Sequence, residues 1–238
     1  MKARVKIALG ALCLAMSLFV AYSLAQMALC SKPSPGGEVF SQQDKSALPA
    51  VDWNYWERTN PQICAWLYIP GTNISYPVVQ ASTEEPDFYL KHDVYNRYNE
   101  YGCIYIDSSC QGWQEDENIR NVVLLGHHMN DGTMLSEIAN YVGQSYASSH
   151  NVIVLLTRQR TIEASPIAAK IENAEAATFH AQFETEGDFT SWLKEEKAAS
   201  AWACEAETTP ERVFTLVTCS YGTFKNERTL VMAVENDD

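Results

Sequence analysis

Short runs of β-branched, aliphatic and aromatic residues recur along most of this chain, and turn-forming segments separate them. Eight runs are expected to form strands: 64–69, 74–80, 102–107, 121–126, 151–157, 161–171, 213–217 and 229–234, with 177–183 as a further candidate. No strand–helix–strand alternation runs through the sequence, which argues against a doubly wound parallel sheet. We therefore predict a mainly β fold, an eight-stranded closed or nearly closed β-barrel with short helical insertions.

Three segments have helical patterns. Residues 44–59 combine polar residues with large apolar ones and end at Asn60-Pro61, which predicts a short amphipathic helix in front of the barrel. Residues 134–142 place apolar side chains at helical spacing. Residues 188–199 form the third candidate helix, and Asp188 is its expected N-cap.

The N-terminus has the pattern of a membrane anchor. Lys2, Arg4 and Lys6 precede an uncharged apolar run at 7–25, which residues 27–29 extend. A helix needs about 20 such residues to cross a bilayer, and the core of a signal peptide is usually shorter. The cations favour a cytoplasmic N-terminus and an extracellular remainder. We predict a cytoplasmic tip and single-pass transmembrane helix at 1–30, a flexible spacer at 31–43 and one folded domain at 44–238.

Two processing routes compete with an uncleaved anchor. Small-x-small sequences at 21–23 and 23–25 allow cleavage by signal peptidase. Cys30 offers a lipidation site, but Leu29 before it is larger than the residue that such processing normally requires.

Charge and motif content exclude several functions. The chain has 17 basic and 30 acidic residues, a net charge of −13, so its surface repels nucleic acid and offers no basic groove for phosphate. It contains no zinc-type cysteine spacing, P-loop, Rossmann glycine pattern or GxSxG motif. We expect no nucleic-acid partner, no metal and no cofactor.

The cysteines leave their pairing open. Five of the seven follow the spacer: Cys64, Cys103, Cys110, Cys204 and Cys219. In an exported protein four of these could pair and leave one thiol free. Cys103 and Cys110 flank a short strand and a turn, so they could approach each other. A free Cys219 would fit a reactive role.

The last two β-type runs carry the clearest chemical signal. The run at 213–217 leads through Thr218 to Cys219, and Arg228 opens the next run after a polar, turn-prone segment. A cysteine at the end of a buried strand can be presented as a nucleophile by a rigid scaffold. An arginine one hairpin away can stabilise a thiolate or a developing oxyanion. The alternatives are an inert core cysteine and a surface arginine paired with Glu227 or Glu235.

A second β-type run ends in histidines. Residues 122–125 lead into Gly126-His127-His128, where Gly126 permits a sharp turn. Histidine can activate a cysteine as a general base or as the imidazolium partner of a thiolate. Adjacent histidines on an extended segment point in different directions and no third ligand is nearby, which disfavours a metal site. A solvated, idle pair is the alternative.

These motifs, taken in chain order, resemble those of the sortases, the cysteine transpeptidases of the Gram-positive cell surface. The matching residues are Gly126-His127, 215–219 and Arg228, and upstream 60–61, 66–74 and 76–80 resemble the start of the family's catalytic barrel. The similarity extends from about Trp53 to Val234. The N-terminal helix, the run at 126–134 and the helix at 188–199 are most like class B. The chain lacks the lid motif of class C and the calcium ligands of class A.

The resemblance implies a role for each candidate residue. Cys219 would attack the backbone carbonyl of a C-terminal sorting signal on a surface protein, and an amine of a peptidoglycan precursor would resolve the thioacyl enzyme. His127 would transfer protons to and from the two amines. Arg228 would hold the carbonyl oxygen, and Thr218 would help to place the substrate. Because an unperturbed thiol and an unperturbed imidazole are both mostly neutral near pH 7, we expect slow turnover with a bell-shaped pH profile.

Two other functions fit the same residues. A membrane-tethered cysteine protease would use the same chemistry with water as the acceptor. A non-catalytic β-barrel binding module would use Cys219 as a structural residue. The sequence specifies neither the sorting signal nor the acceptor amine.

Overall fold

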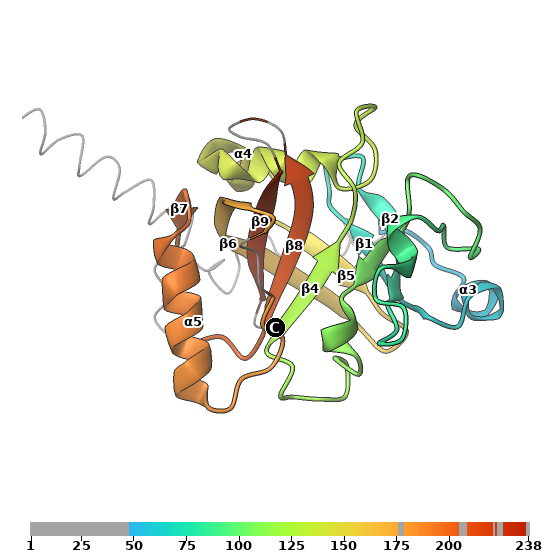
Figure 1. The fold of residues 1–238 in the computed structure, drawn as a ribbon, viewed down its shortest axis with the longest axis horizontal. Helices are drawn as coiled ribbons and strands as arrows, with labels where there is room; N and C mark the ends of the chain where they lie inside the picture. The colour runs from blue at the N-terminus through green and yellow to red at the C-terminus, as the bar shows by residue number, and fades with distance from the viewer. Residues whose placement is uncertain (1–47, 176–178, 205–208, 221, 223–225, 237–238) are drawn as a thin grey trace, which may run out of the picture.

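The computed structural model describes residues 48–175, 179–204, 209–220, 222 and 226–236. Strands of this part form one sheet in the order β5-β1-β2-β3-β4-β8-β9-β6-β7, and an additional pairing of β5 with β6 closes the sheet into a barrel (Figure 1). Eight strands make the ring, as predicted, and β7 pairs with β6 outside it. The strands are β1 Ile63–Tyr68, β2 Ser75–Gln80, β3 Ile104–Ile106, β4 Asn121–Leu125, β5 Ile153–Leu156, β6 Thr161–Asn173, β7 Trp202–Ala203, β8 Val213–Ser220 and β9 Glu227–Glu235.

One parallel pairing brings the ends of two distant strands together. β4 and β8 run parallel, with Asn121 opposite Val213 and Leu125 opposite Val217. Their carboxyl ends therefore lie at the same edge of the sheet. β9 then returns antiparallel to β8 and places Arg228 opposite Cys219.

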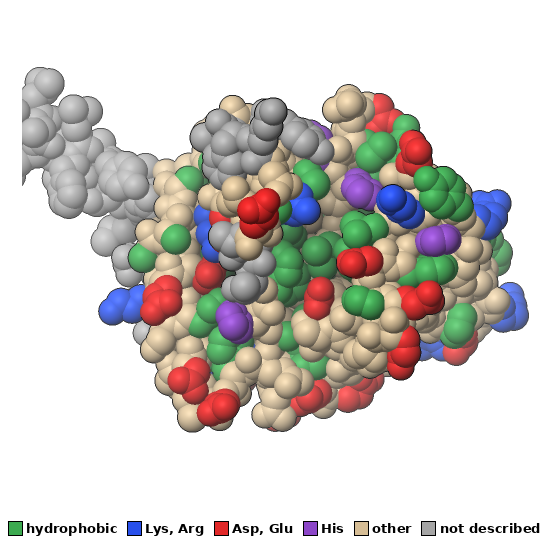
Figure 2. Space-filling model, in the orientation of Figure 1, with side chains coloured by type: hydrophobic (Ala, Val, Ile, Leu, Met, Phe, Trp, Pro, Cys, Tyr) green, Lys and Arg blue, Asp and Glu red, His purple; other side chains and the backbone are tan. Residues whose placement is uncertain are grey.

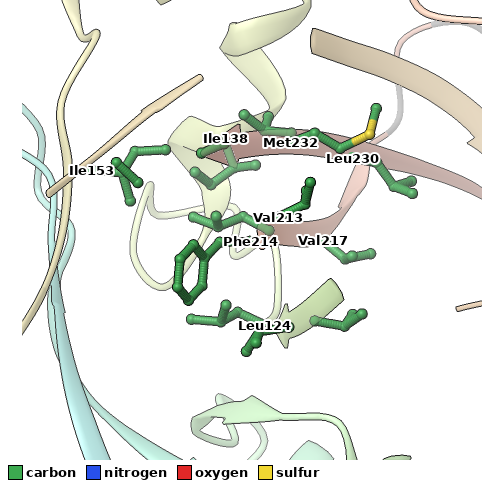
Figure 3. Close-up of a cluster of buried hydrophobic side chains, with 14 of the residues drawn as sticks. Leu124, Ile138, Ile153, Val213, Phe214, Val217, Leu230 and Met232 are labelled. Atoms are coloured by element: carbon green, nitrogen blue, oxygen red, sulfur yellow. The ribbon is translucent and has the colours of Figure 1, made fainter. Parts of the chain in front are cut away.

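The hydrophobic core fills the barrel and both sides of β8. Figure 3 shows Val213, Phe214 and Val217 of β8 between Leu124 of β4 and Met232 of β9, with Ile138 close to the β9 side chains. These side chains are almost fully buried. A strand that is covered on both faces in this way has a continuous apolar sequence. Its close packing holds the residue at its end in a fixed position.

The helices are short and lie around the barrel. The α-helices are α3 Trp53–Thr59, α4 Gln144–Ser149 and α5 Glu186–Ala198, and the 3-10 helices are η1 Phe88–Leu90, η2 Ser108–Cys110 and η3 Ser136–Val142. α3 and α5 lie at opposite ends of the view in Figure 1. η3 packs against β8 and β9. The predicted helix in front of the barrel is confirmed as α3, but it begins only at Trp53.

Three expectations about helices and strands were wrong in detail. The helix expected at 134–142 is the 3-10 helix η3. Asp188 is not an N-cap: Thr185 caps α5, and Asp188 is the third residue of a capping box that bonds back to Thr185. In place of a strand at 177–183, the structure has one isolated bridge between Ile119 and Gln182, and 177–178 lie outside the described residues.

A buried cation fixes α5 to the barrel. Lys170 of β6 is only 6% exposed, and its Nζ lies 2.5 Å from Glu172 and 2.6 Å from Glu196 of α5. Burial lowers the pKa of Lys170, but the hydrogen bonds to the two carboxylates outweigh it and leave the pKa raised. The inserted helix is therefore held to the sheet by charge as well as by its apolar side chains.

The predicted anchor at 1–30 and spacer at 31–43 lie outside the described residues, and the predicted domain boundaries stay a prediction. None of the helices in the described part of the chain combines the length and the apolarity needed to cross a bilayer.

Candidate active site

Two of the candidate catalytic side chains, His127 and Cys219, lie at the ends of β4 and β8. The backbone pairing continues one residue past β4, because Gly126 N–H donates to the Val217 carbonyl oxygen (3.2 Å). His127 follows directly, and Cys219 lies at the end of β8. Both side chains are partly exposed, although the strands before them are buried. The two sequence-predicted strand ends therefore meet in space.

Gly126 is required for a reason other than the expected turn. A Cβ at this position would lie 2.8 Å from Cγ of Leu135 and 2.9 Å from its Cδ1. Leu135 N–H in turn donates to the His127 carbonyl oxygen (2.9 Å). The glycine thus allows the buried Leu135 to pack directly on the backbone that carries His127.

The cysteine and the arginine are in contact. Arg228 Nη1 lies 2.8 Å from Cys219 Sγ. The alternative partners of Arg228 are engaged elsewhere, because Glu235 pairs with Arg160 and Glu227 accepts from Gly222 N–H. A guanidinium donor at this position can bind a thiolate or an oxygen atom that develops negative charge beside the sulfur.

His127 contacts a backbone carbonyl. Its Nε2 lies 2.7 Å from the Leu90 carbonyl oxygen, at the end of η1. The described residues contain no hydrogen bond between the His127 ring and Cys219 Sγ. The structure therefore brings all three candidate groups to one edge of the barrel, with the imidazole held separately from the thiol–guanidinium pair.

Two side-chain hydrogen bonds join the loop after β4 to the end of β8. Thr218 Oγ1 donates to the Gly126 carbonyl oxygen (3.0 Å), and His128 Nδ1 lies 2.9 Å from the Cys219 carbonyl oxygen. Thr218 is 1% exposed. In this structure Thr218 braces the two strand ends, and its contact with substrate stays a prediction. His128, to which the sequence analysis assigned no catalytic role, is part of the same brace.

One further residue near the site has no sequence signal. Tyr105 of β3 is buried, and burial raises the pKa of its phenol, with smaller effects from charges that include Arg228 and Cys219. The pairing of β3 with β4 places Tyr105 opposite Leu125, near the end of β4, and so close to Cys219 and Arg228. Across the described ranges, no group of three or more His, Cys, Asp or Glu side chains could hold a metal ion.

The other cysteines do not compete with Cys219. Cys64, Cys103, Cys110 and Cys219 are free thiols, so the possible pairing of Cys103 with Cys110 was wrong, whereas Cys204 is disulfide-bonded. Cys103 and Cys110 lie in separate hydrophobic clusters, which keeps them apart. Burial raises the pKa of Cys64 and Cys103 to about 12 and that of Cys110 to about 11. These three thiols therefore stay protonated near neutral pH.

The face that carries the site is apolar at its centre. In Figure 2, hydrophobic side chains gather near the centre of the view, where Figure 1 shows β4 and β8. Charged and histidine side chains lie around this apolar centre, and some acidic ones lie close to it.

Comparisons with known proteins find relatives in sequence and in fold. No protein-family model matches the chain. Sortase B of Staphylococcus aureus is 28% identical over 165 residues, which cover 68% of this chain and 65% of that protein. The structure of Clostridium perfringens sortase B matches with a TM-score of 0.70 and 28% identity, over 77% of this chain and 99% of that one. A Staphylococcus aureus sortase B–substrate complex matches with a TM-score of 0.66 and 26% identity, over 77% of this chain and 83% of that one.

These findings support a class B sortase. The resemblance found in the sequence motifs is thus confirmed by overall sequence similarity and by the fold. The matched part spans 65% of the length of the Staphylococcus aureus relative. Within the sortase-type barrel, the candidate residues lie at the shared end of β4 and β8.

The brace in this sortase-type site predicts a difference between two threonines that face each other across β8 and β9. Thr218→Val leaves the Gly126 carbonyl without its hydroxyl donor and is expected to lower the free energy of unfolding by about 1–2 kcal/mol. Thr229 lies opposite Thr218, and its buried hydroxyl has no partner among the described residues, so Thr229→Val is expected to be neutral or stabilising. Urea unfolding of both variants measures the difference, and equal losses would contradict the brace.

The raised thiol pKa values predict selective alkylation. At pH 8, iodoacetamide is expected to modify Cys219 in the folded protein and to leave Cys64, Cys103 and Cys110 unmodified, because the raised pKa of each of these three keeps its thiol protonated, and Cys103 and Cys110 are also buried. Peptide mapping by mass spectrometry follows each cysteine separately, and a denatured sample provides the control for full modification. Equal labelling of Cys103 and Cys219 in the folded protein would contradict the assignment.

Proposed function

We propose that this chain is a sortase transpeptidase that cleaves a C-terminal sorting signal of surface proteins through a thioacyl bond to Cys219 and transfers the acyl group to a cell-wall amine. The observation that carries the proposal is the 2.8 Å contact between Arg228 Nη1 and Cys219 Sγ at the strand end beside His127. Similarity to class B sortases, one of them solved as a substrate complex, supports a peptide substrate.

The proposed reaction has two acyl transfers. The Cys219 thiolate attacks the carbonyl carbon of the scissile peptide bond, and Arg228 binds the oxygen as it becomes negative. The C–N bond breaks and the leaving amine takes a proton from His127, which produces a thioester. An amine of a peptidoglycan precursor then attacks the thioester carbonyl and gives a proton to His127, the C–S bond breaks, and the thiolate is restored.

The apolar face over β4 and β8 supports a substrate that binds in extended form. Backbone carbonyls of such a peptide could reach the exposed edge of the site near Arg228, while its side chains cover the apolar centre. Arginine suits this role because its donors have a fixed geometry and its charge is permanent at neutral pH. Thr218, by contrast, acts in this proposal through the strand ends that it joins.

Water is the competing acceptor. A cysteine protease would form the same thioester and hydrolyse it, and the partly exposed Cys219 and His127 are open to water as well as to an amine. A non-catalytic binding barrel would need neither the thiol–guanidinium contact nor a reactive thiol.

One experiment separates the three functions. The purified protein is incubated with a panel of sorting-signal peptides, with and without triglycine as the acceptor. We expect cleavage of the peptide without the amine and ligation to triglycine with it. The Cys219→Ala variant should lose both reactions, and the Cys64→Ala variant should keep them. Cleavage that is indifferent to the amine would assign a protease. A protein inert towards every peptide, with Cys219 unreactive towards thiol reagents, would assign a binding module.

The proposed location follows from the sequence at 1–30, which we propose to be a single-pass anchor that leaves the catalytic domain outside the cell. Fractionation and protease treatment of intact cells test this prediction. We expect the full chain in the membrane fraction, with the domain digested from outside, and deletion of residues 2–29 should release it. Full protection in intact cells, with digestion only after lysis, would contradict the orientation.

A further inference from the structure

The hydrogen bond between the His127 ring and the Leu90 carbonyl identifies which ring nitrogen carries the hydrogen. A carbonyl oxygen can only accept, so the hydrogen of this 2.7 Å contact belongs to His127 Nε2. Nδ1 is then the nitrogen that is left to exchange protons, and the described residues give it no hydrogen-bond partner. We propose that the Leu90 carbonyl is the orienting group of His127 and that Gly102 is a positioning residue that holds this carbonyl in place. The inference rests on the proposed function only in treating His127 as the acid–base group.

The Leu90 carbonyl belongs to a well-fixed stretch of backbone. Leu90 N–H donates to the Asp87 carbonyl oxygen (3.1 Å) within η1. On either side of Leu90, Cys103 N–H donates to the Tyr89 carbonyl oxygen (2.9 Å), and Asn99 N–H donates to the Lys91 carbonyl oxygen (2.9 Å). Both peptide neighbours of Leu90 are thus tied to the segment that leads into β3, which fixes the direction of the carbonyl between them.

Gly102 makes this arrangement possible. Its φ of +61° lies in the left-handed region, and it is buried. A Cβ at this position would lie 2.5 Å from the Tyr89 carbonyl oxygen and 2.8 Å from the Leu90 carbonyl oxygen. Both atoms are backbone and cannot rotate away as a side chain would. Any side chain at residue 102 must therefore move the acceptor of His127.

The arrangement suits acid–base catalysis. A base is effective when a third group fixes its ring orientation and tautomer, which is the logic of catalytic triads. Here a backbone carbonyl occupies the place that a carboxylate or amide takes in such triads. When His127 takes up a proton at Nδ1, the bond from Nε2–H to the carbonyl becomes charge-assisted and stabilises the imidazolium. The segment from η1 to Gly102 then supports catalysis by fixing the orientation of the His127 ring, although none of its side chains needs to touch the substrate.

The tautomer of His127 provides a direct test on the unaltered protein. We expect ¹⁵N NMR of histidine-labelled protein, at a pH where the ring is neutral, to show Nε2 protonated and Nδ1 unprotonated. The His127→Gln variant assigns the signals. A ring that is protonated at Nδ1, or that populates both tautomers equally, would overturn the inference. This measurement does not depend on activity.

A matched pair of glycine variants tests the role of Gly102. Gly102→Ala is expected to lower kcat for the ligation by about 10- to 100-fold, because small displacements of catalytic groups have effects of this size, with KM for the peptide little changed. The same variant should lose the Nε2–H preference of His127. Gly112 has a φ of +81°, and a Cβ there would meet no atom of the described residues within 4 Å, so Gly112→Ala carries the backbone penalty alone and should keep both kcat and the tautomer.

The outcomes separate this inference from the proposed function. A wild-type protein that ligates no peptide counts against the sortase proposal, and the NMR result still decides the tautomer. Active wild-type protein with the wrong tautomer overturns the inference alone. Folded Gly102→Ala with wild-type kcat also overturns it, as does an equal loss in Gly112→Ala. If Gly102→Ala does not fold, the tautomer of the unaltered protein decides.

Discussion

The parallel pairing of β4 with β8 is the constraint on which the rest of this site depends. His128 and Cys219 are 91 residues apart in the chain, yet a hydrogen bond joins the ring of one to the backbone of the other. Parallel strands end at the same edge, so whatever follows each strand is brought together without any local sequence signal. The antiparallel return through β9 then adds Arg228 opposite Cys219. One parallel and one antiparallel ladder therefore place Cys219, Arg228 and the histidine loop, residues 126–128 after β4.

Packing makes these positions rigid. β8 is buried on both faces up to Thr218, and the Thr218 hydroxyl and the His128 ring extend the contact between the two strand ends beyond the regular ladder. The Leu135 side chain packs directly against Gly126, at the start of the histidine loop. Side chains at the end of such a strand lose little additional freedom when they bind a substrate, because the backbone beneath them is already fixed.

Local patterns predicted the strands better than the ends of the helices. Alternating and continuous apolar runs are set by burial on a sheet, and the sheet exists as expected. Helix ends depend on which polar side chain reaches which backbone N–H, so Asp188 was taken for a cap although Thr185 has that role. The run at 134–142 has helical spacing, but its side chains pack against β8 and β9 in a 3-10 geometry. Cys103 and Cys110, which are close in sequence, face different clusters because the short β3 and its turn separate them.

The sequence by itself determined the mainly β class and the resemblance to sortases, and it named Cys219, His127 and Arg228 as candidates, because these depend on residue types and on their order along the chain. Only the tertiary structure decided which atoms these side chains meet. The Leu90 carbonyl that holds His127, the close approach of Gly102 and the bracing role of Thr218 involve backbone atoms that every residue possesses. Backbone groups carry no signature in a sequence, and they acquire a partner only when the closed barrel brings distant segments to one edge.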